Sequence, residues 1–316
     1  MSLSYIGQQI TIYGGFCFLV TGTVGNAINI FIFSTVHSYR TNPSTFYFLI
    51  NSVFNIAYLF MNLASRIAIG FGDDLTRTST SWCKARNYFL YTFSIIVLIC
   101  PCMAMIDQFL ITSRSAKLRS LSKIQTAHRS VVVMIIICVL HGIFPAISYD
   151  ISSVTKTCQV FNQIFITYRS IFLLGLLTTI PITITTLFAY LTYRNIRSIR
   201  VLISQHVDQQ ILRMSLAQVF FVNFCIIPYA IIVTYNYITE KETKNTIRIL
   251  REQLATSFFT LWNYGYYVGT CYVFMLSSKK FRRTVKDRIL FWRRRNQVNI
   301  FALPKRNTDL QRQTIN

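Results

Sequence analysis

The chain has 316 residues, of which 53% are hydrophobic and only 13% charged, and its mean hydropathy is +0.43. Water-soluble domains carry about 25% charged residues, so the composition excludes an ordinary soluble protein. A net charge of +22 would suit nucleic-acid binding on a soluble domain. Here the basic residues lie in short segments between apolar blocks and in the tail, as in membrane-protein loops, and we expect no nucleic-acid partner.

Seven apolar blocks are long enough to cross a bilayer, which takes about 20 residues in a helix. They are Ile10–Ser34, Thr45–Ile69, Tyr88–Thr112, Val131–Tyr149, Ile171–Thr192, Ser215–Tyr237 and Leu254–Leu276. The seventh block is the most polar of them. The sequence therefore predicts an all-α fold, a seven-transmembrane helix bundle over residues 10–276. Residues 1–9 form a short segment before it.

The distribution of basic residues predicts the orientation of this bundle. With the N-terminus outside the cell, 22 of the 32 Lys and Arg residues fall in cytoplasmic segments or in the tail. Six of the ten acidic residues then lie outside. Because Lys and Arg are enriched on the cytoplasmic side of membrane proteins, we expect a multi-pass plasma-membrane protein whose N-terminus is extracellular.

A basic segment with regularly spaced apolar residues follows the last span. Its apolar positions are Phe281, Val285, Ile289 and Trp292. This spacing predicts an amphipathic helix over residues 277–295 that lies on the membrane surface, with its rings in the acyl boundary and its charges on anionic lipid. A solvated basic tail is the alternative. Residues 296–316 are expected to form a disordered cytoplasmic tail.

Two of the eight cysteines lie outside the predicted spans on the outer side. Cys83 begins the third span, and Cys158 lies in the loop between the fourth and fifth spans. Both would face an oxidising compartment, which favours a disulfide. The bond would hold this loop over the mouth of the bundle, and two free thiols are the alternative.

Ionisable residues avoid the predicted membrane interior. No carboxylate lies deep in a span, and Asp107, near the cytoplasmic end of the third, comes closest. Ion- and proton-coupled transporters usually need such groups at mid-membrane, so coupled transport is disfavoured. The four histidines have no metal-ligand spacing. We expect no metal site, no cofactor and no enzymatic activity.

Neutral polar and aromatic residues form stripes in the outer half of three spans. A polar stripe on a spanning helix should face protein or a cavity rather than lipid, so these residues are candidates for a ligand pocket. The alternative for each is an interhelical hydrogen bond. The candidates are Asn87, Tyr91 and Ser94 on the third span, Tyr229 on the sixth, and Thr260, Asn263 and Tyr264 on the seventh.

Taken together, the topology, the outer cysteine pair and the terminal basic helix resemble the rhodopsin-like (class A) G-protein-coupled receptors. The resemblance extends from about residue 10 to residue 292. Gly25-Asn26 is similar to the family's Gly-Asn pair in the first span, and Asp107, 24 residues after Cys83, lies where its Asp-Arg-Tyr motif begins. The resemblance implies an activation core made of Asn26, Asn55, Pro181, Phe224, Pro228 and Phe274.

Several positions depart from the family pattern. Gln108 replaces the Arg of the Asp-Arg-Tyr motif, Asn55 replaces the second-span Asp, and Ile226 replaces the sixth-span Trp. In the family, that Arg exchanges partners between the Asp and the G protein. Gln108 can form hydrogen bonds but carries no charge. These departures describe a divergent member.

The resemblance implies a receptor that binds an extracellular peptide or neutral small molecule and signals to a heterotrimeric G protein. Coupling is assigned to Asp107, Gln108, Arg194, Arg197 and Arg200. Two alternatives remain open. One is a seven-span channel or uncoupled transporter, because neutral polar stripes could line a permeation path. The other is a receptor-like scaffold that no longer couples.

Overall fold

The computed structural model describes residues 3–153, 155–198, 209–239 and 242–289. Within them, six helices are long and apolar enough to cross a membrane. These helices span Leu3–Thr35, Pro43–Phe71, Thr80–Thr112, Ile124–Ser148, Gln163–Arg197 and Gln209–Ile238. A further helix of 32 residues, α14 (Thr246–Ser277), packs along two of the others but is too polar to join that set. The all-α fold is confirmed.

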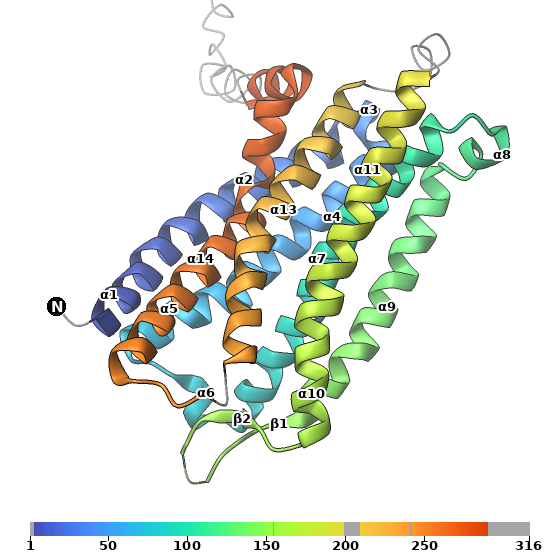
Figure 1. The fold of residues 1–316 in the computed structure, drawn as a ribbon. Helices are drawn as coiled ribbons and strands as arrows, with labels where there is room; N and C mark the ends of the chain where they lie inside the picture. The colour runs from blue at the N-terminus through green and yellow to red at the C-terminus, as the bar shows by residue number, and fades with distance from the viewer. Residues whose placement is uncertain (1–2, 154, 199–208, 240–241, 290–316) are drawn as a thin grey trace, which may run out of the picture.

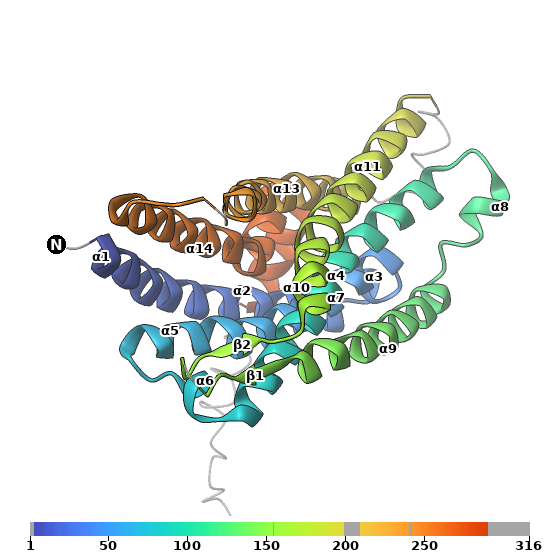
Figure 2. The same cartoon turned by 60° about the horizontal axis from the view of Figure 1, so that its bottom comes forward.

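The first helix begins earlier than the sequence predicts. It consists of α1 (Leu3–Gln9), a π-helical turn (Ile10–Gly14) and α2 (Gly15–Thr35). Residues 3–9, expected to precede the span, are already helical and continue directly into the π-helical turn. α1 lies beside the start of α14 (Figures 1 and 2).

The second helix has clear start and stop signals. Short α3 (His37–Arg40) precedes α4 (Pro43–Tyr58), a π-helical turn (Leu59–Leu63) and α5 (Ala64–Phe71). The Asn42 side chain caps α4 by accepting hydrogen bonds from two backbone N–H groups, and Pro43 occupies the first helical position. Gly72 ends α5 at φ +101°, a left-handed conformation that favours glycine.

The third long helix, α7 (Thr80–Thr112), is the most buried of the set. It follows short α6 (Leu75–Thr78) and packs against α4, α9 and α11. Short α8 (Ala116–Arg119) leads to α9 (Ile124–Ser148). A β-hairpin of β1 (Tyr149–Ile151) and β2 (Cys158–Val160) follows, paired antiparallel with Ile151 opposite Cys158.

Three more long helices complete the bundle. α10 (Gln163–Ile171), a π-helical segment (Phe172–Thr179) and α11 (Ile180–Ser198) form one continuous helix. α13 (Gln209–Ile238) and α14 then run side by side. The β-hairpin, α6 and the start of α1 lie at one end of the bundle, here called the hairpin end (Figure 1). α3, α8 and the end of α14 lie at the other, here called the opposite end.

The residues after α14 do not behave as the sequence predicts. Residues 279–289 are helical, but Phe281 and Val285 are buried against the bundle rather than exposed to lipid. The Phe281 ring lies 5.6 Å from the ring of Phe33 and 6.0 Å from that of Phe274. Intramolecular aromatic packing covers the Phe281 ring, so the expectation of rings in the acyl boundary is wrong for Phe281. Trp292 lies outside the described residues.

Candidate functional site

A disulfide ties the β-hairpin to the start of α7. Cys83 and Cys158 are bonded, which confirms the predicted pair. Asn87, one turn along α7, donates from Nδ2 to the Cys83 carbonyl at 2.9 Å and to the Cys158 sulfur at 3.4 Å. Asn87, a predicted ligand-binding residue, therefore supports the disulfide.

Tyr91 is also occupied by the protein itself. Its side chain is 2% exposed, and its ring lies 4.6 Å from Phe172 and 5.8 Å from Phe165. The Tyr91 hydroxyl lies 3.4 Å from that of Tyr149 on β1. Ser94 donates to the Tyr91 carbonyl within the same helix. These predicted pocket residues form packing between α7, α10 and the hairpin.

A cluster of tyrosines fills the bundle between α4 and α14. Tyr58 and Tyr267 stack with ring centroids 4.0 Å apart, and Tyr264 lies 5.7 Å from Tyr58. Tyr58, Tyr264 and Tyr267 are buried. Thr260 donates to the Thr256 carbonyl one turn earlier. Asn263 and Tyr229 are half-buried.

The hairpin end contains a cavity of about 870 Å³. Its walls come from α1, α5, the start of α7, the end of α13 and the start of α14. None of the seven predicted ligand-binding residues lines it, although Thr260 bonds to a lining residue. Residues of α1, α5 and α14 line this cavity in place of the predicted pocket residues. The charged lining residues are Arg66, Arg86, Lys244 and Glu252.

Glu252 is held by two cations at the rim of this cavity. Its carboxylate accepts from Lys244 Nζ at 2.5 Å and from Arg248 Nε at 3.0 Å. The Tyr235 hydroxyl donates to it at 2.9 Å. The hydrogen bond from Lys244, with those from Tyr235 and Arg248, lowers the pKa of Glu252. Arg248 also pairs with Glu242 at 2.8 Å. These rim acids therefore already have basic partners.

Sequence reasoning missed both arginines of the cavity. Arg66 lies on α5, inside the predicted second span, so the expectation that basic residues avoid the spans is wrong there. Arg86 lies on α7, where the helix begins before the predicted apolar block. A basic residue inside an otherwise apolar block was the signal available, because such residues usually face a cavity.

Below the tyrosines, a buried network of neutral groups joins α2, α4 and α14. Asn26 donates from Nδ2 to the Tyr267 carbonyl at 2.8 Å, and Asn55 donates to Asn26 Oδ1 at 3.0 Å. Asn29 donates to Ser52 at 3.2 Å. The structure thus brings together Asn26 and Asn55, two predicted members of the activation core.

The other predicted core residues are scattered. Phe274 is fully buried among the rings of Phe33, Phe48 and Phe281. The Pro181 carbonyl accepts from Thr185 at the start of α11, and Pro228 lies within α13. Within the described part of the chain, none of these three residues is hydrogen-bonded to the Asn26 side chain.

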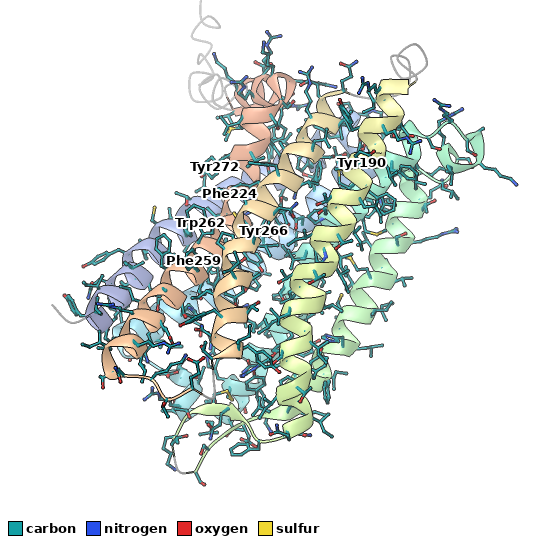
Figure 3. The ribbon with its side chains drawn as sticks, in the orientation of Figure 1. Tyr190, Phe224, Phe259, Trp262, Tyr266 and Tyr272 are labelled. Atoms are coloured by element: carbon teal, nitrogen blue, oxygen red, sulfur yellow. A yellow bond between two sulfur atoms is a disulfide. The ribbon has the colours of Figure 1, made fainter. Side chains whose placement is uncertain are left out.

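Phe224 lies on the outside of the bundle and is 49% exposed. Its ring is 5.1 Å from that of Trp262, whose Nε1 donates to the Phe224 carbonyl at 3.1 Å (Figure 3). The Phe224 side chain therefore faces outward rather than into the bundle. The neighbouring Cys225 and Ile226 are buried instead, because the helical turn rotates them toward the interior.

A second polar network closes the opposite end. Asp107 accepts from Ser44 Oγ at 2.5 Å and from Ser122 Oγ at 2.6 Å. Gln108 donates from Nε2 to Ser44 Oγ at 2.7 Å and is 2% exposed. Arg194 and Arg197 on α11 are exposed, and Arg200 lies outside the described residues. Asp107 and Gln108 thus bond inward, to α4 and to the segment after α8.

The described residues hold no group of three or more His, Cys, Asp or Glu side chains that could bind a metal ion. No protein-family model and no curated protein matches the chain.

Proposed function

We propose that the protein is a divergent rhodopsin-like G-protein-coupled receptor in the plasma membrane, with α14 as a seventh span and the N-terminus outside the cell. The hairpin end then faces outward and receives the ligand, a peptide or a neutral small molecule. The opposite end faces the cytoplasm and a heterotrimeric G protein. The helix over residues 279–289 would carry its basic residues along the anionic inner leaflet.

One observation carries this proposal: α7 and α14 each contribute side chains to the cavity and to a buried hydrogen-bond network away from it. α7 supplies Arg86 to the cavity and Asp107 to the closed network at the opposite end. α14 supplies Glu252 to the cavity and Thr270 to the network below the tyrosines. A ligand that shifts either helix at the cavity therefore acts on buried hydrogen bonds far from it. Such an arrangement is what transmission through a bundle requires.

The interior favours a receptor over a channel. Below the cavity, Tyr58, Tyr264 and Tyr267 pack ring against ring. Tyr266 is fully buried and donates from its hydroxyl to the Val97 carbonyl at 3.0 Å. A permeation path would have to break this packing.

The test uses the full chain in cells that carry dissociation sensors for each class of G protein. We expect compounds from a ligand library to cause dissociation only in cells that express the protein. Silence across all classes, or a conductance in reconstituted vesicles without G protein, would contradict a receptor.

A scaffold that no longer couples is the second candidate, and the burial of Gln108 favours it. Gln108 is hydrogen-bonded to Ser44 and carries no charge. It therefore gives a G protein no charged side chain to bind. For a receptor, Gln108→Arg should raise basal G-protein dissociation several-fold. Gln108→Met, of similar size but without hydrogen bonds, is the control. If Gln108→Arg stays silent while ligands still bind, the scaffold is favoured.

A further inference from the structure

The cavity at the hairpin end carries unbalanced positive charge. Among the residues that the structure describes, four charged ones line it and three of these are basic. The acid, Glu252, is shared by Lys244 and Arg248. This leaves Arg66 and Arg86. Asp74, the residue that caps α6, already pairs with Arg77 at 2.9 Å.

Neither arginine has an acceptor within the described part of the chain. No hydrogen bond or ion pair joins Arg66 to another described side chain, and the buried Nε of Arg86 has no partner. A buried polar group without a partner is rare in folded proteins and calls for an explanation. Both arginines line the same cavity, so two like charges face one space without a described acid to offset them. A bound anion would relieve both costs.

The rest of the cavity suits an organic molecule. Leu3, Ile69, Ile249 and Leu254 provide apolar wall. Hydroxyl and amide groups of Ser4, Gln8, Thr11, Asn236 and Ser257 lie between them. A volume of about 870 Å³ falls within the range of about 300–1,000 Å³ found for small-molecule sites.

We propose that this cavity binds a small organic carboxylate, whose anionic group is held by Arg66 and Arg86. A planar guanidinium can donate two parallel hydrogen bonds to one carboxylate, and the apolar wall accepts the body of the molecule. The inference rests on the proposed function, because it takes the bound acid to be the ligand of the receptor. The ligand would then be an acid rather than a neutral molecule.

The test measures thermal unfolding of the purified full-length protein at constant ionic strength, with benzoate, benzamide and sulfate as probes. Benzoate and benzamide share a shape and differ in charge. We expect benzoate to raise the unfolding temperature in a saturable way, because a ligand that binds the folded state stabilises it. Benzamide and sulfate should have little effect.

Substitutions locate the site. Arg86→Gln and Arg66→Gln should each raise the half-saturating benzoate concentration about tenfold or more, since each loses charge-assisted hydrogen bonds. Arg251→Gln, an exposed residue on α14 outside the lining, should leave it unchanged. If a Gln variant does not fold, Arg86→Lys keeps the charge without the bidentate geometry and should weaken benzoate binding.

Three outcomes overturn the proposal: equal stabilisation by benzoate and benzamide, equal stabilisation by sulfate, or an unchanged benzoate response in the Arg66 and Arg86 variants. The receptor proposal fails separately. Benzoate binding that depends on both arginines, without any G-protein response, would keep the acid site and remove the signalling function.

Discussion

Glu252 is the acid with the most partners at the rim of the cavity. Because Lys244 and its neighbours hold its pKa below the usual value of 4.5, its ion pairs stabilise the folded state fully above that pH. The contribution disappears as the pH falls through the lowered folded-state pKa. Between pH 6 and pH 3, the unfolding temperature of the wild type should therefore fall further than that of Glu252→Gln. Parallel curves for the two proteins would contradict the assignment.

Asn26 is the centre of the buried network between α2, α4 and α14. Asn26→Leu would remove one hydrogen bond to the Tyr267 carbonyl and leave the buried Asn55 amide without its acceptor, and such an unsatisfied group costs about 1–3 kcal/mol. We expect a clear drop in unfolding temperature. Thr21→Val, on the same helix, removes only a local bond to the Cys17 carbonyl and should change stability by about 0.5 kcal/mol or less.

At the scale of residues, the pairing of Cys83 with Cys158 followed from residue type and from their position on the outer side. The resemblance to the receptor family singled out Asn26, which lies in the interior. The ligand-pocket residues did not follow, since a polar stripe satisfied by packing looks the same in sequence as one that faces a cavity. Tyr91 is the clearest case, because its partners come from α10 and β1.

Among the elements, α7 and α9 approach closely at Gly142. A Cβ atom there would lie 2.1 Å from Thr92 Oγ1 and 2.9 Å from Tyr88 Cε2. Gly142→Ala should therefore force the helices apart and destabilise the protein by about 1–3 kcal/mol. Gly175 has open space around it, so Gly175→Ala should be neutral or stabilising by about 0.5–1 kcal/mol. Thermal unfolding of both variants checks the pair, and equal effects would be inconsistent with this contact.

Hydropathy predicted the long helices well, because burial in lipid demands apolar runs of a fixed length. It could not predict their ends. α1 begins at Leu3 and α7 at Thr80 because helix geometry continues through polar residues at the hairpin end. The cavity is lined by those polar turns, which is why hydropathy did not reveal it. The burial of Phe281 depends on its contact with Phe33. The two residues are far apart in the sequence, so no local pattern predicts this contact.

For the whole molecule, the predicted orientation can be tested by labelling single introduced cysteines on intact cells. Thr155→Cys lies in the hairpin loop and Ser120→Cys beyond α8, and both positions are exposed. A membrane-impermeant maleimide should label Thr155→Cys directly and Ser120→Cys only after permeabilisation. The wild type, whose free cysteines are mostly buried, gives the background. The reverse labelling pattern would show that the hairpin end faces the cytoplasm.

The network around Asn26, Asn29, Asn55 and Thr270 consists of amides and hydroxyls. Moving one elementary charge across a membrane is worth about 2.3 kcal/mol per 100 mV, whereas a rearrangement among neutral groups moves no full charge through the field. In the proposed receptor, the resting potential would then change the free-energy difference between the inactive and active hydrogen-bond arrangements of this network by almost nothing. Excitable and non-excitable cells would therefore respond to the same ligand concentration in the same way.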